Sequence, residues 1–281
     1  MPTFDTPGPI RAELHFRFVI ANVRVTAEAR VDTEIEVRPA DPARKADQRV
    51  AEQTKIEFAD GVLTARAPRL GSLVGRTGAV DVHLRLPEAS GLAGETGMGE
   101  VVTEGPLGEV KFSSGYGDLR VDRAETVHLR CSTGDVTLGE AGRADVAASN
   151  GRVDIGRVDG PVRVDNGNGA SRIGEATGEV RVTSANGAVA VERAYGDVTA
   201  RNANGRIEIG EVVRGTVTLE TAAGSLAVGV REGSAAWLDL STIAGQVRNE
   251  LTAGDAPAGD DERVSIKART HIGNILVRRA R

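Results

Sequence analysis

Three copies of one short stretch decide the fold of this chain: Ser-Asn-Gly-Arg-Val-Asp-Ile at 149–155, Ala-Asn-Gly-Ala-Val-Ala-Val at 185–191 and Ala-Asn-Gly-Arg-Ile-Glu-Ile at 203–209. In each copy a glycine turns the chain and an alternating apolar triplet follows. This marker glycine recurs as Gly99, Gly117, Gly134, Gly151, Gly169, Gly187, Gly205, Gly224, Gly245 and Gly273. Its spacing is 17 to 19 residues and widens to 21 and 28 only in the last two copies. A fixed period of this length predicts a solenoid.

Each period contains a second strand with two apolar residues that alternate with polar ones. The pairs are Val110/Phe112, Val127/Leu129, Val146/Ala148, Val162/Val164, Val180/Val182, Val198/Ala200, Val217/Leu219, Leu238/Leu240 and Val264/Ile266. Because alternate residues point to opposite faces of a strand, each pair can point into one shared core. A single turn leaves its backbone groups unpaired, so we expect every strand to pair, in parallel and in register, with the equivalent strand one turn away.

The pattern therefore predicts an all-β fold, a single-stranded parallel β-helix (β-solenoid) with turns of about 18 residues. Glycine suits the tight corners because it adopts positive φ at little steric cost, and asparagine is the next most tolerant residue. The predicted structural turn consists of the marker glycines, above all Gly117, Gly134, Gly151, Gly169, Gly187, Gly205 and Gly224, with Asn150, Asn186 and Asn204 before them. With Asn168, these asparagines are expected to stack into an amide ladder.

The first third of the chain predicts a different organisation. Residues 1–9 are an extended lead-in, residues 10–94 an irregular β cap continuous with the solenoid, and residues 95–281 the repeats, with a mobile loop at 253–262. Within the cap we expect one short helix over 41–52 with Asp41 as its N-cap, a hairpin turn at Asp60-Gly61 and a loop at 69–78. A strictly alternating strand over 80–86 ends at Pro87.

Several side chains are assigned a face from the alternation. Leu14, Phe16, Phe18 and Ile20 are expected on one face of the first strand, with Glu13, His15, Arg17 and Val19 on the other. Trp237, the only tryptophan, is expected to pack as a plug in a late turn. The last strand, 275–277, is expected to form the exposed end, where Arg278, Arg279 and Arg281 oppose the formation of filaments.

Composition and charge exclude several classes of protein. The formal net charge is −5, from 40 acidic and 35 basic residues, and no basic block is available to neutralise nucleic acid. Cys131 is the only cysteine, so no internal disulfide is possible. The apolar runs are too short for membrane insertion, and the first residues do not resemble a signal peptide. We therefore expect a cytoplasmic protein, or one at the extracellular surface if another route exports it.

Three features together resemble a known family: the opening Phe4-Asp5-Thr6-Pro7-Gly8-Pro9-Ile10, a strand that ends in Leu86-Pro87, and the repeated Ser/Asn-Gly-x-Val-x-Ile turns. They are similar to the bacterial β-strand-repeat family of unknown function labelled putative adhesin. The resemblance covers nearly the whole chain. It implies a β-repeat fold and a binding role at the cell surface, and it supplies no catalytic residues.

The strongest candidate surface in the sequence is an acidic ladder at the position after the marker glycine, formed by Glu100, Asp118 and Asp135. In register, these carboxylates would lie about 5 Å apart and repel one another unless a cation or solvent intervenes. The alternative is that these are solvated turn residues. Calcium requires six or more oxygen ligands, and no Asp-x-Asp-x-Asp-Gly loop is present, so we expect the turn role and no metal or cofactor.

Other reactive residues give weaker signals. A polysaccharide-acting enzyme on this scaffold would need a carboxylate cluster and a basic residue on one face, and that face could be lined by Arg130, Arg152, Arg163 and Arg181. His15, His83, His128 and His271 are widely separated in sequence and show no metal-ligand spacing. Cys131 lies next to an alternating strand and is expected to be partly buried and inert.

We therefore predict a non-enzymatic β-solenoid, a binding or structural module that contacts a protein or a glycan. The alternatives are a polysaccharide-acting enzyme and a cytoplasmic self-assembling scaffold. The predicted oligomeric state is a monomer or a weak oligomer.

Overall fold

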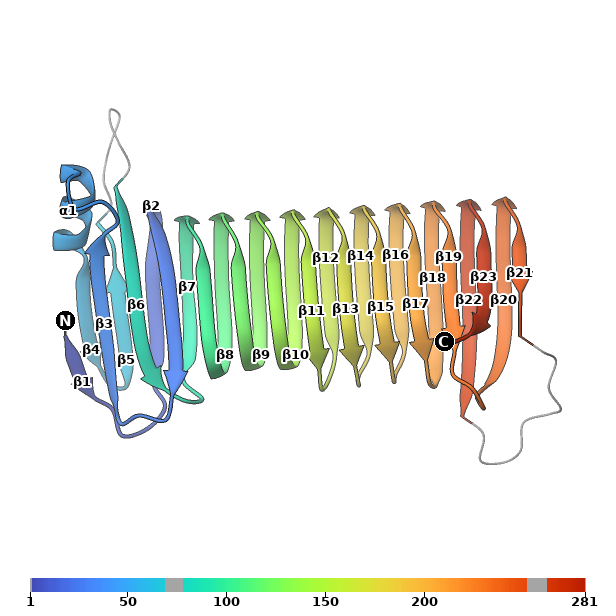
Figure 1. Ribbon diagram of the computed structural model, residues 1–281, viewed down its shortest axis with the longest axis horizontal. Helices are drawn as coiled ribbons and strands as arrows, with labels where there is room; N and C mark the ends of the chain where they lie inside the picture. The colour runs from blue at the N-terminus through green and yellow to red at the C-terminus, as the bar shows by residue number, and fades with distance from the viewer. Residues whose placement is uncertain (1, 69–77, 252–261, 281) are drawn as a thin grey trace. The chain divides into compact units, whose positions relative to one another are not determined.

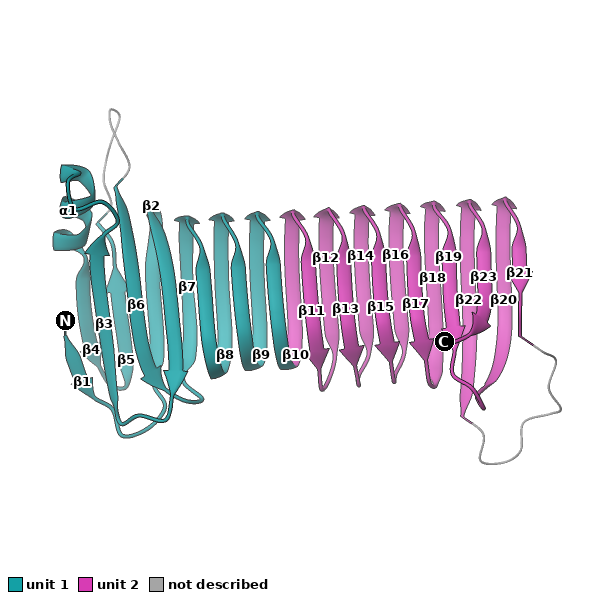
Figure 2. Ribbon diagram, in the orientation of Figure 1, with its two compact units in different colours: residues 1–141 teal, residues 142–281 magenta. Residues whose placement is uncertain are grey.

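The computed structural model describes residues 2–68, 78–251 and 262–280, and the chain forms two compact units, Met1–Ala141 and Gly142–Arg281 (Figure 2). Nearly all of the described elements are β-strands, and α1 (Lys45–Gln53) is the only helix among these residues. The all-β prediction is confirmed. The loops predicted at 69–78 and 253–262 lie outside the described residues except for Gly78 and Glu262. The boundary predicted at residue 95 stays a prediction.

Unit 2 consists of two-stranded turns stacked in parallel (Figure 1). The strands of its regular turns are β11 (Val153–Val158), β12 (Val162–Asn168), β13 (Ser171–Ala176), β14 (Val180–Asn186), β15 (Val189–Ala194), β16 (Val198–Asn204), β17 (Ile207–Val212), β18 (Gly215–Ala223) and β19 (Leu226–Val230). Each pairs with the strand one turn away, as when Val164 of β12 lies opposite Val182 of β14. The predicted inward residues of these turns, including Val164, Val182 and Ala200, are at most 2% exposed. The β-solenoid is therefore confirmed, and its core is a narrow column of small aliphatic side chains.

The marker glycines form the corners of these turns. All ten have φ between +126° and +155°. At Gly187 a Cβ atom would lie 2.1 Å from the carbonyl oxygen of Gly169, so any side chain there would collide with the backbone of the preceding turn. Beside this corner, the amide groups of Asn150, Asn168, Asn186 and Asn204 form a continuous ladder, with Nδ2–Oδ1 distances of 2.8 to 3.0 Å.

A second repeated position supports the same corner, and sequence analysis missed it. The residue three places before the marker glycine points inward and is usually small and polar. In several turns its side chain donates a hydrogen bond to the carbonyl oxygen of the neighbouring turn's marker glycine: Asn202 to Gly187 at 2.7 Å, Thr270 to Gly224 at 3.0 Å and Asn166 to Gly151 at 3.2 Å. These bonds satisfy carbonyl groups that the sharp corner turns away from the strand ladders.

The final turns do not stack in sequence order. Strand β22 (Arg263–Ile272) pairs with both β18 and β20 (Ala235–Ala244), and β23 (Ile275–Arg279) pairs with both β19 and β21 (Val247–Asn249). The last turn of the chain is therefore inserted between two earlier ones (Figure 1). The prediction that residues 275–277 form the exposed end is wrong, because β20 and β21 occupy that place.

This insertion also corrects the assignments made for β20. Leu238 and Leu240 are only half-buried, because no further turn covers them in the described part of the chain. Trp237 is 63% exposed and is not a plug. Instead of lying at a free edge, Arg279 donates hydrogen bonds from Nη1 to the carbonyl oxygens of Arg231 at 2.9 Å and Ser234 at 3.0 Å.

Unit 1 contains β1 (Thr3–Asp5), β2 (Arg11–Glu28), β3 (Asp32–Pro39), β4 (Lys55–Ala59), β5 (Val62–Arg66), β6 (Ala79–Pro87), β7 (Gly91–Met98), β8 (Val101–Tyr116) and β9 (Leu119–Thr133). The long strand β2 pairs in parallel with β5 and β7 through its first half and with β6 and β8 through its second. Antiparallel strands end both rows: β4 pairs with β5, while β3 pairs with β6 and β1 with β3. The predicted hairpin at Asp60-Gly61 is confirmed, with φ of 50° and 74° at its two turn residues.

Two assignments in unit 1 are wrong for local reasons. The pairing of β2 with β7 shifts between Phe16 and Ile20, which places Arg17 and Phe18 both outward and returns Val19 to the core. Phe18 is consequently 57% exposed. An irregularity of this kind adds a residue to the alternation, so a period of two fails across it.

The helix begins later than predicted. Its N-cap is Arg44, without a side-chain capping bond, whereas the Asp41 carboxylate accepts from the Ala43 amide in the preceding turn. The acidic residue that matters is Asp47, which is completely buried and accepts backbone hydrogen bonds from Ala79 at 3.0 Å and Asp41 at 3.2 Å. These bonds fasten the helix to the start of β6.

Candidate functional site

The structure places the predicted acidic ladder at a corner of unit 1, where the carboxylates have internal partners. Arg120 forms ion pairs with Glu100 and, at 3.2 Å, with Asp118. The second carboxylate oxygen of Asp118 accepts a hydrogen bond from the backbone amide of Asp135 at 2.9 Å. These contacts support the role of solvated turn residues, and the binding role of Glu100, Asp118 and Asp135 stays a prediction.

The other reactive residues are not gathered into one site. Among the described residues, no group of three or more His, Cys, Asp and Glu side chains is arranged to hold a metal ion. Cys131 is buried, and its thiol donates to the carbonyl oxygen of Gly117 at 3.4 Å. Burial, and after it the charge of Asp118, raises the pKa of the Cys131 thiol. The cysteine therefore takes the inward polar position of its turn and is held as the thiol.

Two of the arginines considered for a polysaccharide-acting enzyme lie side by side in unit 2. Arg163 and Arg181 lie opposite each other on β12 and β14, whereas Arg152 follows the corner glycine of its turn and Arg130 belongs to unit 1. A carboxylate holds each member of the adjacent pair: Asp165 contacts Arg163 at 2.9 Å, and Glu179 contacts Arg181 at 2.8 Å. The structure thus assembles only part of the predicted cationic face.

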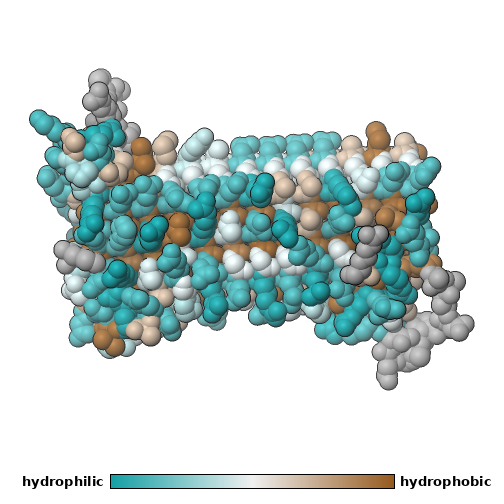
Figure 3. Space-filling view, viewed as in Figure 1, coloured by the Kyte–Doolittle hydropathy of each residue, from teal (hydrophilic) through white to brown (hydrophobic). Residues whose placement is uncertain are grey.

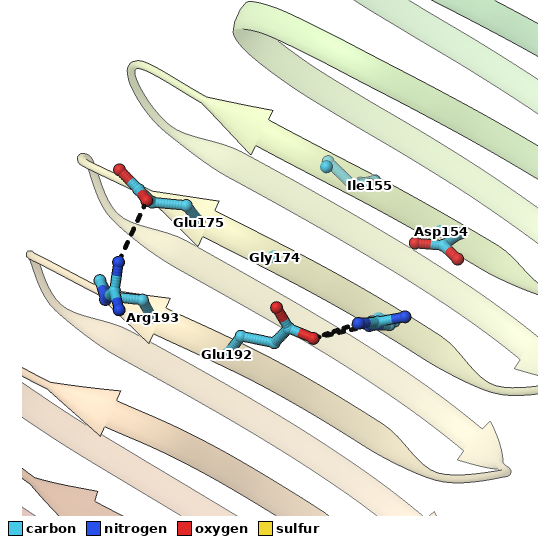
Figure 4. Close-up of a pocket in the computed structure, with 8 residues that line it drawn as sticks. Asp154, Ile155, Gly174, Glu175, Glu192 and Arg193 are labelled. Atoms are coloured by element: carbon cyan, nitrogen blue, oxygen red, sulfur yellow. Dashed lines mark hydrogen bonds and ion pairs between the residues drawn. The ribbon is translucent and has the colours of Figure 1, made fainter. Parts of the chain in front are cut away.

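A more developed site lies on the opposite sheet of unit 2, across β11, β13 and β15. It is a shallow trough of about 450 Å³, lined by Asp154, Ile155, Gly156, Arg172, Gly174, Glu175, Glu192 and Arg193 (Figure 4). Gly156 and Gly174 form its floor. They have no side chain, and they lie between two rows of outward-facing side chains on these strands. A Cβ atom on Gly174 would lie 2.5 Å from the carbonyl oxygen of Gly156, so a side chain at this position would require the backbone to shift.

One wall of the trough is a row of alternating charges along the solenoid axis. Glu175 contacts Arg157 at 2.9 Å and Arg193 at 3.6 Å, and Glu211 contacts Arg193 at 3.0 Å and Arg231 at 3.8 Å. The two glutamates are about one quarter exposed, with side-chain accessibilities of 24% and 22%. Each residue in the interior of the row therefore contacts a residue of opposite charge on both sides.

Glu192 crosses the trough toward the other wall. It occupies the floor position of β15 and reaches Arg172 on β13, with a distance of 2.9 Å to Nε (Figure 4). This hydrogen bond, and after it the charges of Glu192 and Asp154, raises the pKa of Arg172. In the same way, the hydrogen bond that Arg193 donates to Glu211, and after it the charge of Glu211, raise the pKa of Arg193. Both arginines are therefore permanently charged donors.

The trough residues were missed because sequence analysis searched for chemistry beside the marker glycine. The relevant signal lies five and six residues after it. Position five is glycine in Gly156, Gly174 and Gly210, and position six alternates in sign through Arg157, Glu175, Arg193 and Glu211. Alignment of the repeats on their marker glycines would have shown both rows.

Figure 3 shows polar residues over most of the viewed face, with hydrophobic residues visible between them. No helix in the described part of the chain is long and apolar enough to cross a membrane.

Comparison with known proteins concerns the fold and the family. A putative adhesin from Bacteroides fragilis shares 12% identity, with 98% of this chain and 95% of that one covered and a TM-score of 0.39. A putative lipid binding protein from Parabacteroides distasonis also shares 12% identity, with 98% and 96% covered and a TM-score of 0.43. No curated protein sequence matches the chain. The model of the family described as Toastrack DUF4097 matches residues 12–277, and the chain belongs to that family.

Proposed function

We propose that the chain is a non-catalytic binding module whose trough holds an extended glycan without net negative charge. The observation that carries the proposal is the glycine floor at Gly156 and Gly174 between walls of charged side chains. Glycine exposes the peptide groups of the floor, so a chain lying along the trough can contact backbone as well as side-chain polar atoms. The trough crosses several turns, and its polar groups repeat with the spacing of the turns, about 4.8 Å. This arrangement suits a repeating, extended ligand.

The charges of the lining favour a neutral polyhydroxyl chain. The trough residues include three carboxylates, from Asp154, Glu175 and Glu192, and two guanidinium groups, from Arg172 and Arg193. Hydroxyl groups both donate and accept hydrogen bonds, so a sugar can donate to the carboxylates and accept from the guanidiniums. A polyanion would meet more negative than positive groups in the same space.

The ion pairs support binding rather than acid catalysis. A glycosidase uses two carboxyl groups beside the bond to be broken, one of which keeps its proton through a raised pKa. Here Glu175 lies between Arg157 and Arg193, and Glu192 is hydrogen-bonded to Arg172. Both carboxylates are therefore engaged in ion pairs, an arrangement that suits the holding of hydroxyl groups rather than the placing of a proton donor beside a glycosidic bond.

The proposal is tested with purified protein and a panel of soluble polysaccharides in native affinity electrophoresis. The panel contains neutral dextran, laminarin and arabinoxylan, with alginate as the acidic probe. We expect at least one neutral glycan to retard the protein and alginate not to. Release of reducing ends from any of these glycans would overturn the non-catalytic assignment, and binding to alginate alone would overturn the assignment of ligand class.

A matched pair of variants locates the site. The double substitution Arg172→Ala/Glu192→Ala removes the ion pair across the trough, in which the side chains are 57% and 53% exposed. The control Arg181→Ala/Glu179→Ala removes a similarly exposed pair, 62% and 46%, from the opposite sheet. We expect the trough variant to lose affinity by about tenfold or more, consistent with the loss of charged hydrogen bonds, while the control is unchanged. The reverse result would place the ligand on the face of Arg163 and Arg181.

A glycan-binding role favours a location where glycans are exposed, in contrast to the cytoplasmic location expected from the N-terminal residues. Fractionation of the native cells, followed by immunodetection, separates the two. Recovery in the cytoplasmic fraction alone would favour the scaffold alternative over an adhesive role.

A further inference from the structure

Unit 2 ends in a strand whose outer edge is unpaired in the described part of the chain. Strand β20 pairs with β22 on one side, and no described strand pairs with its other side. The Ala235 amide donates to the Glu262 carbonyl oxygen at 2.9 Å. The backbone N–H and C=O groups of the odd-numbered residues in the regular part of β20 therefore point toward β22. Because peptide groups alternate along a strand, the amides and carbonyls of Leu238, Leu240 and Thr242 point away from the solenoid. A strand of ten residues with a free edge is a template for pairing with another strand.

The side chains of this strand are unusually apolar for an exposed edge. On its outer face Trp237 is 63% exposed and Ile243 is 80% exposed. On its inner face Leu238 and Leu240 occupy core positions yet remain half-exposed. In every interior turn the equivalent inner pair is covered by another turn, as Val180 and Val182 are by Val198 and Ala200. The end of unit 2 therefore presents the surface on which a further turn would stack.

We propose that this edge pairs with the same edge of a second copy, forming a two-fold dimer through antiparallel β20 strands. A two-fold axis through Leu240 places that residue opposite its own mate and Leu238 opposite Thr242 of the second copy. These are the residues whose peptide groups point outward, so they form the hydrogen-bonded pairs of an antiparallel ladder. The same register brings Trp237 opposite Ile243 of the second copy, twice, in the non-hydrogen-bonded pairs where side chains approach most closely.

The pattern of charge selects this register. Asp239 lies opposite Ser241 of the second copy, so no like charges face each other across the new ladder. Within its own chain Asp239 is 3.5 Å from Arg269, which lies on β22 and partly neutralises it. A shift of the axis by one residue, to Asp239, would still pair outward-pointing peptide groups, but it would place two carboxylates directly opposite each other.

A two-fold pairing uses the same edge of both copies and so closes at two, and the described edge strands of unit 1 do not offer a comparable edge. Its outermost strands β1 and β4 are short and antiparallel to their neighbours, and β4 carries the exposed charges Lys55 and Glu57. The rings of Phe4 and Phe58 join these two strands at a centroid distance of 5.1 Å. Short, charged edge strands oppose pairing, so within the described ranges the edge of β20 is better suited to self-association. This inference does not depend on the proposed glycan trough.

The dimer is tested by sedimentation velocity over about 5 to 500 µM protein, a range that covers weak two-fold association. Two double variants change the same exposed positions. Trp237→Lys/Ile243→Lys places like charges opposite each other in both outer pairs, whereas Trp237→Lys/Ile243→Glu places opposite charges there. We expect wild type to dimerise, the like-charge variant to weaken the dimer about tenfold or more, and the opposite-charge variant to retain it. The control Phe18→Lys removes an exposed aromatic residue of unit 1 and leaves association unchanged.

A cysteine pair tests the register. In Asp239→Cys/Ser241→Cys the two positions face each other across the proposed ladder, and mild oxidation should give a covalent dimer on non-reducing gels. Cys131 is 3% exposed and should not contribute. A wild-type protein that stays monomeric over the whole range, equal dimerisation by the two charge variants, or no cross-link in a dimerising sample would each overturn the proposal. Circular dichroism of every variant verifies that the strands are intact.

Discussion

Substitution of alanine for Gly187 tests why the corners require glycine. The reason is either the backbone conformation alone or, in addition, the lack of space for a side chain between adjacent turns. The backbone of Gly187 has φ of +130°, and a Cβ atom there would lie 2.1 Å from the carbonyl oxygen and 2.6 Å from the carbonyl carbon of Gly169. The conformation alone costs about 1 to 3 kcal/mol for a residue with a side chain. The contact with backbone cannot be relieved by a rotamer change, so the turns must separate locally and give up hydrogen bonds and packing, which brings the expected loss to about 3 to 5 kcal/mol.

Gly233 provides the matched control. It also has positive φ, +84°, but a Cβ atom there would have no heavy atom within 4 Å. Gly233→Ala should therefore cost only the conformational strain, about 1 to 2 kcal/mol, reduced by the lower entropy of the unfolded alanine chain.

The two variants are compared with wild type by urea denaturation. Far-UV circular dichroism follows the strands, and the fluorescence of Trp237, the only tryptophan, follows β20. Two probes are needed because solenoid turns contact mainly their neighbours, so unfolding can be local. If Gly187→Ala lowered the midpoint no more than Gly233→Ala at similar m-values, the assignment of the corner glycines to close approach between turns would be refuted.

Three further perturbations follow from burial. Val182→Asp places a carboxylate at a position that is 1% exposed in the core, and it should cost several kcal/mol in urea titration, whereas Thr183→Asp on the outer face should change stability by less than about 1 kcal/mol. The raised pKa of Cys131 stabilises the native state below the thiol's ordinary pKa, and this contribution is lost as the pH rises through the folded value. Iodoacetamide should accordingly modify native Cys131 much more slowly than the unfolded chain at pH 9, and equal rates would contradict its burial. Amide hydrogen exchange should be slower in β22 than in β20, although β22 lies nearer the end of the chain, because β22 is paired on both sides; faster exchange in β22 would argue against the insertion.

The repetitive part of the fold was predictable because three independent requirements coincide at the same period. A glycine corner, an inward apolar pair and a strand on each side recur together, so an error at one position is corrected by its equivalents in other turns. Gly187, Val189 and Val191 in one turn and Gly205, Ile207 and Ile209 in the next illustrate this redundancy. The same reasoning fails where the chain has no equivalent for comparison, as at Phe18, where the register shift of β2 reverses the alternation.

The trough was harder to predict because its residues have no distinctive chemistry individually. Glu175 and Arg193 resemble ordinary solubilising charges until the register of β13 and β15 places them beside each other. The floor depends on Gly156 and Gly174, which resemble additional turn residues in a glycine-rich sequence. The trough forms because residues of successive turns lie side by side. Their proximity depends on the pairing of strands across turns and not on the spacing of residues within one turn.

The inserted last turn shows a competition between chain connectivity and burial that the sequence period alone does not resolve. Lengthening the repeat from 18 to 28 residues costs only about 0.4 kcal/mol in loop-closure entropy, since that cost grows with the logarithm of length. Burial of one branched aliphatic side chain is worth about 1.5 to 3 kcal/mol. The last turn supplies Val277, which is completely buried, whereas the displaced turn carries the polar Asn249 at the position paired with it. Placing the more apolar turn inside therefore outweighs the longer connection, and the less apolar turn is left as the edge of the solenoid.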